Sequence, residues 1–137
     1  MSTWADAELI KAMEYGIEWY RLGKIEIISS DGDMRRIAVD MWANLLREII
    51  QSKESSETLY LVLDLTGTKQ GTTPYSTQIT RGIAQYLVDS REGNTYASVL
   101  MKNELLVGII NAIFHKYFAR QEKLVYRLFT DKTSGLG

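Results

Sequence analysis

The chain has 137 residues, a length that fits one domain with a hydrophobic core of its own. Hydrophobic residues make up 45% and charged residues 24%, which is typical of a globular protein and not of a disordered or coiled-coil chain. The formal net charge of -1 gives no general positive field that would attract nucleic acid or anionic lipid. Cysteine is absent and His115 is the single histidine, which excludes disulfides, thiolate metal sites and histidine-rich metal centres within one chain.

The first 14 residues form a segment of their own. Their apolar residues have partly helical spacing, which predicts a short helix or a loosely held arm: Trp4, Ala7, Leu9 or Ile10, and Met13. Acidic residues precede the apolar ones, which is not typical of a secretory signal. No stretch of the chain reaches the roughly 18 consecutive apolar residues of a membrane span. We therefore expect a cytoplasmic protein without a transmembrane segment.

A β-hairpin and a long helix are predicted next. The hairpin pairs Ile17–Leu22 with Ile25–Ile28 at one side of the sheet, and Gly23 is the first residue of a two-residue type II′ turn. Between Ser29 and Asp33 lie three residues that suit a helix N-cap: Ser30, Asp31 and Asp33. Apolar residues at helical spacing then predict an amphipathic helix of about five turns: Met34, Ile37, Ala38, Met41, Leu45, Ile49 and Ile50.

The run from Leu59 to Leu65 is apolar except for Asp64, and it is bounded by turn residues. Such a run predicts a buried central strand. The Thr/Gly-rich loop that follows leaves the carboxyl end of this strand, where open α/β sheets usually have their binding surface. At the end of the loop, Thr73 suits an N-cap and Pro74 suits the first position of a second helix.

The remaining elements complete an α/β pattern. The second helix is expected to bury Tyr75, Ile79, Gly82, Ile83, Tyr86 and Leu87. A strand over residues 96–101, a third helix over 104–119 capped by Asn103, and a strand over 123–129 follow. Because helices join these strands, right-handed crossovers make the strands parallel. We predict one α/β domain over residues 15–130, with a mixed, mostly parallel five-stranded sheet, an N-terminal hairpin, three main helices and a flexible tail over 131–137.

Residues 61–68, LVLDLTGT, resemble the central-strand signature of the STAS superfamily, and in particular its SpoIIAA-like members, named after an anti-sigma-factor antagonist. The order of the elements from Ile17 to Phe129 is also similar, so the resemblance covers most of the chain. It implies a small bacterial protein that acts as a non-enzymatic regulatory or protein-interaction module. Such a module would dock a partner through the loop after the central strand and would need no metal or cofactor.

The chain departs from this family at the phosphorylation site. In the antagonists that define the family, the loop carries Asp-Ser-Ser-Gly and the second serine is phosphorylated, whereas here the matching residues are Thr72-Thr73-Pro74-Tyr75. Pro74 therefore occupies the phosphoacceptor position. Thr72, Thr73 and Ser76 are the candidate substitutes. Only seven residues follow Thr130, which leaves little room for the C-terminal helix of the family.

The loop after the central strand is the best candidate site. Its glycines would let backbone amides approach a ligand, and the following helix N-terminus would favour an anion. Three interpretations stay open: a purely structural connection, a partner-binding or phosphorylated loop, and a small anion site. The residues concerned are Asp64, Thr66, Gly67, Thr68, Lys69 and Gly71. For Asp64 we favour a structural role, in which its carboxylate accepts hydrogen bonds from the loop, over that of a catalytic acid or base.

The third predicted helix is apolar nearly all round, so it needs cover on more than one side. The N-terminal arm, a second subunit or a lipid would each provide it. The predicted homodimer or lipid face consists of Leu106, Ile110, Phe114 and Phe118. The alternative function is therefore a binding module for a small apolar or lipid-like ligand. Basic residues are scattered along the chain, which argues against a nucleic-acid partner.

Overall fold

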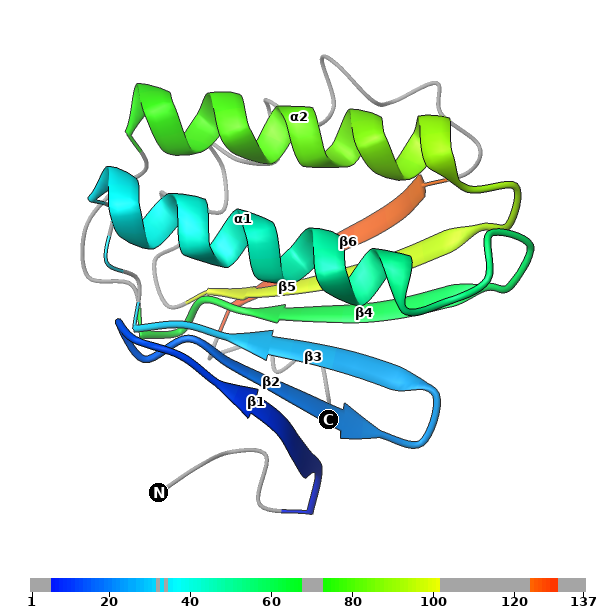
Figure 1. Ribbon diagram of the computed structural model, residues 1–137, viewed down its shortest axis with the longest axis horizontal. Helices are drawn as coiled ribbons and strands as arrows, with labels where there is room; N and C mark the ends of the chain where they lie inside the picture. Colours follow the sequence, from blue (N-terminus) through cyan, green and yellow to red (C-terminus); the bar gives the residue numbers. More distant parts are fainter. Residues whose placement is uncertain (1–5, 32, 34, 68–72, 102–123, 131–137) are drawn as a thin grey trace.

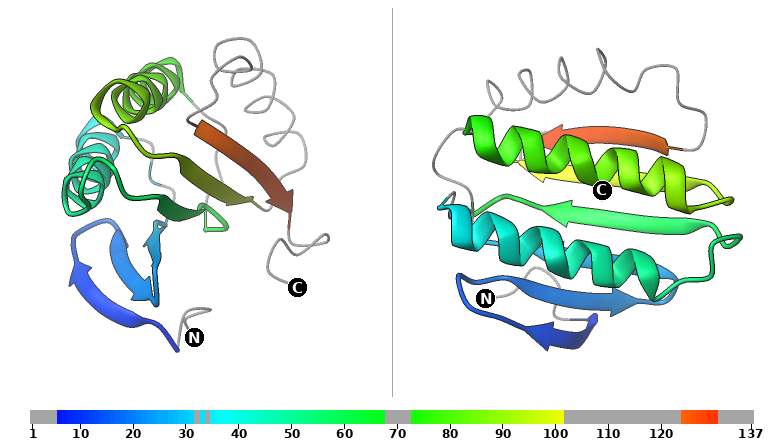
Figure 2. Two further views of the ribbon diagram at one scale, coloured as in Figure 1. Left: turned by 90° about the vertical axis from the view of Figure 1, so that its right-hand side faces the viewer. Right: turned by 45° about the horizontal axis from the view of Figure 1, so that its top comes forward.

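The computed structural model describes residues 6–31, 33, 35–67, 73–101 and 124–130. Six strands form a single sheet whose spatial order follows the chain, and two helices lie side by side on one of its faces (Figures 1 and 2). The elements are β1 (Glu8–Ala12), β2 (Glu18–Leu22), β3 (Ile25–Ser29), α1 (Arg36–Gln51), β4 (Leu59–Asp64), α2 (Pro74–Ser90), β5 (Thr95–Met101) and β6 (Leu124–Thr130). The predicted third helix lies outside the described residues.

The strand directions confirm that the strands joined by helices are parallel. β1, β2 and β3 are antiparallel neighbours, whereas β3, β4, β5 and β6 run parallel to one another. α1 joins β3 to β4, and α2 joins β4 to β5. β4 therefore lies in the interior of the sheet, between β3 and β5, as its apolar sequence predicts.

The sheet has six strands and not five, because residues 8–12 form a strand where a helix or arm was predicted. Leu9 lies opposite Tyr20 and Ala12 lies opposite Glu18, with a bulge between them. Pairing with β2 thus overrides a weak helical spacing, as is usual for short segments whose conformation depends on a neighbour. The predicted β2–β3 hairpin is confirmed, and Gly23 has the positive φ of +59° that its turn needs. The hairpin is not at the margin, since β1 is the edge strand.

The main core lies between the sheet and the two helices. α1 contributes Leu45, Leu46, Ile49 and Ile50, β4 contributes Leu59, Leu61 and Leu63, and α2 contributes Ile83, Ala84 and Leu87. Two residues expected on the buried helix faces are instead exposed: Ile37, in the first turn of α1, and Gly82, in the middle of α2. None of the predicted residues Ser30, Asp31 and Asp33 is the N-cap of α1, although Asp33 Oδ1 accepts a hydrogen bond from the backbone N–H of Arg35 at 2.9 Å. Arg35 is the N-cap residue and makes no side-chain cap, since the helix begins later than its apolar pattern suggests.

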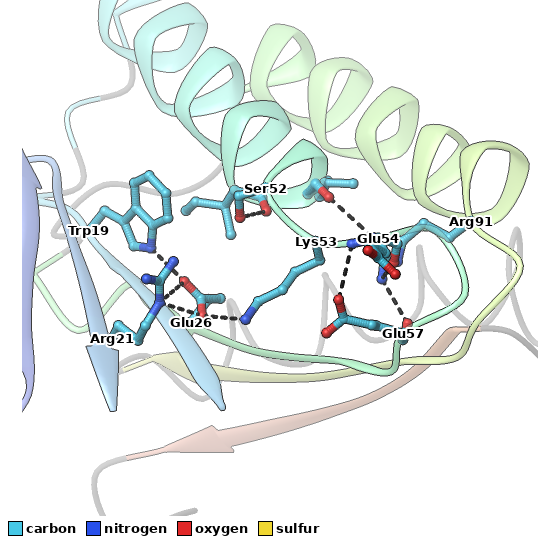
Figure 3. Close-up of polar contacts among 10 residues, drawn as sticks. Trp19, Arg21, Glu26, Ser52, Lys53, Glu54, Glu57 and Arg91 are labelled. Atoms are coloured by element: carbon cyan, nitrogen blue, oxygen red, sulfur yellow. Dashed lines mark hydrogen bonds and ion pairs between the residues drawn. The ribbon is translucent and has the colours of Figure 1, made fainter. Parts of the chain in front are cut away.

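Two buried polar side chains organise the rim at the amino ends of the parallel strands (Figure 3). Glu26 is fully buried, and its carboxylate accepts hydrogen bonds from Trp19 Nε1 at 3.0 Å and from Arg21 Nε, while Lys53 Nζ lies 3.2 Å away. The guanidinium of Arg91 donates to three backbone carbonyls, those of Ile50, Glu54 and Glu57. These contacts tie the end of α1 and the connection to β4 to the sheet and to the end of α2.

Candidate functional site

Three connections meet at the carboxyl ends of β3 and β4, and we call this edge of the molecule the carboxyl rim. They are the β1–β2 turn at Tyr15–Gly16, the described residues of the β3–α1 connection (30, 31, 33 and 35), and the first residues after β4. The backbone N–H of Ser30 donates to the carbonyl of Asp64 at 3.2 Å, which joins the second connection to the third. The end of β4, from which the predicted loop leaves, is therefore joined to the β3–α1 connection.

Two glycines allow these connections to pack closely around Asp31. A Cβ atom at Gly16 would lie 2.1 Å from the Asp31 Cγ atom, and a Cβ at Gly67 would lie 2.9 Å from the carbonyl oxygen of Ser30. Gly16 also has a positive φ of +65°. Since no other residue fits these positions without displacement, both glycines are needed for the shape of the rim.

Asp64 orders the turn that leaves β4. Its side chain is buried, and its Oδ1 atom accepts hydrogen bonds from the backbone N–H of Thr66 at 3.1 Å and from the Thr66 hydroxyl at 2.6 Å. This is the arrangement of an aspartate that replaces a backbone acceptor in a turn. The predicted hydrogen bonds from the loop to the Asp64 carboxylate are confirmed by these contacts.

Thr73 and Ser76 form a reciprocal cap at the start of α2. Thr73 Oγ1 accepts from the Ser76 N–H at 3.0 Å, and Ser76 Oγ accepts from the Thr73 N–H at 2.9 Å. The Ser76 hydroxyl also donates to the Thr73 carbonyl, and Ser76 is buried. The predicted cap at Thr73 and the proline at the first helical position are thus confirmed. A kinase would have to break this cap to reach the hydroxyl of Ser76.

Tyr15 and Arg35 form the first of two arginine–tyrosine pairs at the rim. Tyr15 has a φ of +62°, and together with Gly16 it forms a turn with two positive φ values, closed by the Ile17 N–H and the Glu14 carbonyl. The Arg35 guanidinium lies over the Tyr15 ring, with Cζ 5.0 Å from the centroid. Its Nη2 atom lies 2.7 Å from the carboxylate of Asp33, and this hydrogen bonding lowers the pKa of Asp33.

The second pair joins the starts of the two helices. The Arg36 guanidinium lies over the Tyr75 ring, with Cζ 4.6 Å from the centroid. The Tyr75 hydroxyl donates a hydrogen bond to the carboxylate of Asp40, and this bond raises the pKa of Tyr75. Ile37, the residue after Arg36, is 55% exposed, so the first turn of α1 also presents an aliphatic side chain to solvent. The rim thus presents aromatic, cationic and aliphatic groups together.

The structure describes some of the predicted site residues and not others. Asp64, Thr66 and Gly67 lie at the rim with Thr73 and Ser76. The other loop and phosphorylation candidates lie outside the described residues: Thr68, Lys69, Gly71 and Thr72. The same holds for the predicted dimer or lipid face of Leu106, Ile110, Phe114 and Phe118, so the lipid-binding alternative stays a prediction.

Sequence reasoning missed both arginine–tyrosine pairs, because their members are far apart in the chain and meet only through the topology. One local signal pointed to part of this arrangement. The Tyr15-Gly16 dipeptide precedes a strand, and a glycine at that place favours a tight hairpin turn.

In the described part of the chain, no three histidine, aspartate or glutamate side chains are grouped so that they could hold a metal ion. Within the same residues, no helix has both the length and the apolar character needed to cross a membrane. Comparisons with models of protein families, with curated proteins and with solved structures found no match for this chain.

Proposed function

We propose that this chain is a non-enzymatic, cytoplasmic regulatory module with a STAS-like sheet, which docks a protein partner at the carboxyl rim. The observation that carries the proposal is the pair of arginine–tyrosine contacts, Tyr15 with Arg35 and Arg36 with Tyr75. Tyrosine and arginine are the residue types that contribute most to binding at protein interfaces, together with tryptophan.

The pairs are held in place before any partner arrives. Asp33 bonds the guanidinium of Arg35, and Asp40 accepts from the hydroxyl of Tyr75. Side chains that are already ordered lose less conformational entropy on binding, so such a surface binds more tightly than a mobile one. The carboxylates of Asp33, Asp40 and Asp64 are each engaged by a neighbouring side chain. This arrangement favours a recognition surface over an acid–base centre.

The order of elements supports the STAS-like part of the proposal. The loop after the interior strand β4 leads to the carboxyl rim and then to the capped start of α2. Thr73 and Ser76 are both engaged in the cap, so Thr72 is the acceptor we favour for regulatory phosphorylation. A phosphate there would add about two negative charges near the docking surface and would change which partner binds.

Site-specific photo-crosslinking in the source cells tests this proposal. A photoreactive residue replaces Ile37 at the carboxyl rim or, as the control, Ser55 at the opposite rim; both side chains are exposed. We expect a discrete crosslinked protein from position 37 and none from position 55. The double variant Arg36→Ala/Tyr75→Ala should abolish that product while the protein stays folded. The same products from both positions, or a product that survives the double variant, would contradict docking at the carboxyl rim.

A further inference from the structure

The face of the sheet opposite α1 and α2 carries a continuous row of apolar side chains. Alternation along β4 directs Leu59, Leu61 and Leu63 toward the helices, and therefore Tyr60 and Val62 toward the opposite face. In Figure 2, the left-hand view shows both helices on one side of the strands. Among the described residues, no helix covers the other side.

The register of the sheet aligns five residues on this opposite face. Leu22 lies opposite Ile25, Ile25 opposite Tyr60, Tyr60 opposite Tyr96, and Tyr96 opposite Val125. All five are exposed, by between 37% and 42% of their surface. The row therefore crosses β2 to β6 without interruption, and it contains no charged residue. We call these five residues the apolar row.

The row is not the whole of the exposed apolar surface on this face, because Leu9, which lies opposite Tyr20 on the edge strand β1, is 50% exposed. The next position along the strands holds Tyr20, Ile27 and Val62, which are opposite one another in the same register and are buried. A sheet face in contact with water normally carries polar side chains at such exposed positions. Five neighbouring strands that each expose an apolar residue at one level form a contiguous apolar patch, a feature that often marks an interaction site.

The centre of the apolar row is a flat aromatic surface. The rings of Tyr60 and Tyr96 are stacked, with centroids 5.7 Å apart and an interplanar angle of 16°. Each ring restricts the rotation of the other, so little conformational entropy remains to be lost when a partner packs on them. This is the property expected at the centre of an interface and not at its margin.

We infer that the apolar row is the centre of an interface between two copies of this chain, in which the row of one copy packs against the row of the other about a two-fold axis. The row spans five strands, which is about 19 Å at the usual strand spacing. Its exposed surface is on the order of 400 Å². That is about half of the roughly 800 Å² per subunit that a stable interface buries, and apolar side chains usually form the central part of it.

The absence of charge in the row favours a second copy as the occupant. A two-fold axis brings each central residue close to its own symmetry mate, so a charged residue there would face a like charge. The residues of the apolar row carry no charge at neutral pH: Leu22, Ile25, Tyr60, Tyr96 and Val125. This dimer would leave the carboxyl rim of each copy available to another protein.

Sedimentation velocity of the purified chain tests the inference. We expect a dimer for the wild type. Tyr60→Lys should weaken dimerisation by about 30-fold or more, because it places two like charges at the axis. Ile37→Lys is the matched control, since it introduces the same charge at an exposed apolar residue outside the row. A monomeric wild type, or a dimer that Tyr60→Lys leaves intact, would overturn the inference. So would a monomer that co-floats with phosphatidylcholine vesicles, which would assign the row to a lipid surface.

A disulfide test does not depend on the folding of a charged variant. The chain contains no cysteine, so a single introduced cysteine has no competing partner. Tyr60→Cys should form a disulfide-linked dimer under mild oxidation, whereas Ile37→Cys should stay monomeric on a non-reducing gel. Equal crosslinking at the two positions, or none at position 60, would contradict an interface centred on the apolar row.

Discussion

Arg21 and Glu26 are opposite each other across the β2–β3 ladder, and Arg21 Nε lies 3.1 and 3.0 Å from the two carboxylate oxygens of Glu26. Glu26 has no exposed surface, whereas the Arg21 side chain is 36% exposed. Lys53, which follows α1, lies against the same carboxylate. One buried carboxylate thus joins the hairpin to the end of a helix.

Replacing this carboxylate should destabilise the protein. We expect Glu26→Gln to lower the free energy of unfolding by about 2–3 kcal/mol, because it leaves two partly buried cations without a counter-charge. Urea denaturation followed by circular dichroism measures the change. Glu48→Gln is the control, since the Lys11–Glu48 pair is half-exposed and worth less than about 1 kcal/mol. Similar losses in the two variants would show that the Glu26 network is not specially stabilising.

The same network should give the protein an acid-sensitive stability. Burial alone would raise the pKa of Glu26, but hydrogen bonds from Arg21, Trp19 and Lys53 outweigh it, so the pKa is lowered in the folded state. The stabilisation is therefore complete above the unfolded pKa of about 4.3 and is lost as the pH falls through the lower folded value. We expect the difference in unfolding free energy between wild type and Glu26→Gln to be constant from about pH 6 to 8 and to shrink below about pH 4. A difference that is unchanged at low pH would refute this assignment.

The reciprocal cap of α2 should have a measurable effect of its own. Thr73→Ala removes the acceptor for the Ser76 N–H and should cost about 1 kcal/mol in the free energy of unfolding, whereas Thr73→Ser keeps the acceptor and should cost much less. Gln78→Ala, at an exposed position of the same helix, controls for changes in helix propensity. If the alanine and serine variants at position 73 are equally stable, the cap does not stabilise α2.

Two glycine substitutions should have effects of opposite sign. Gly67→Ala places a Cβ 2.9 Å from the Ser30 carbonyl oxygen, so we expect a loss of about 1–3 kcal/mol as the rim connections move apart. Gly82→Ala meets nothing within 4 Å and lies inside α2, where alanine should stabilise the helix by about 0.5–1 kcal/mol. Chemical denaturation of both variants provides the comparison. A stabilising Gly67→Ala would show that the connections are not closely packed there.

Several elements were predictable because their signals are local. The apolar run at Leu59 predicted an interior strand, Gly23 predicted a tight hairpin turn, and Thr73-Pro74 predicted the start of α2. Each signal acts over a few neighbouring residues and depends on backbone geometry or burial alone. β1 was missed because an exposed edge strand has no strong apolar pattern and is stabilised by its partner β2.

The sequence alone determined the α/β class, the long helix and the direction of the parallel strands, because apolar periodicity and turn residues specify local conformation and the crossover rule specifies direction. Only the tertiary structure decided which distant residues meet. The contact between Tyr15 and Arg35, and the alignment of Leu22 with Tyr60 and Val125, depend on strand register and loop packing. Register arises from many weak contacts at once, so no single stretch of the sequence specifies it.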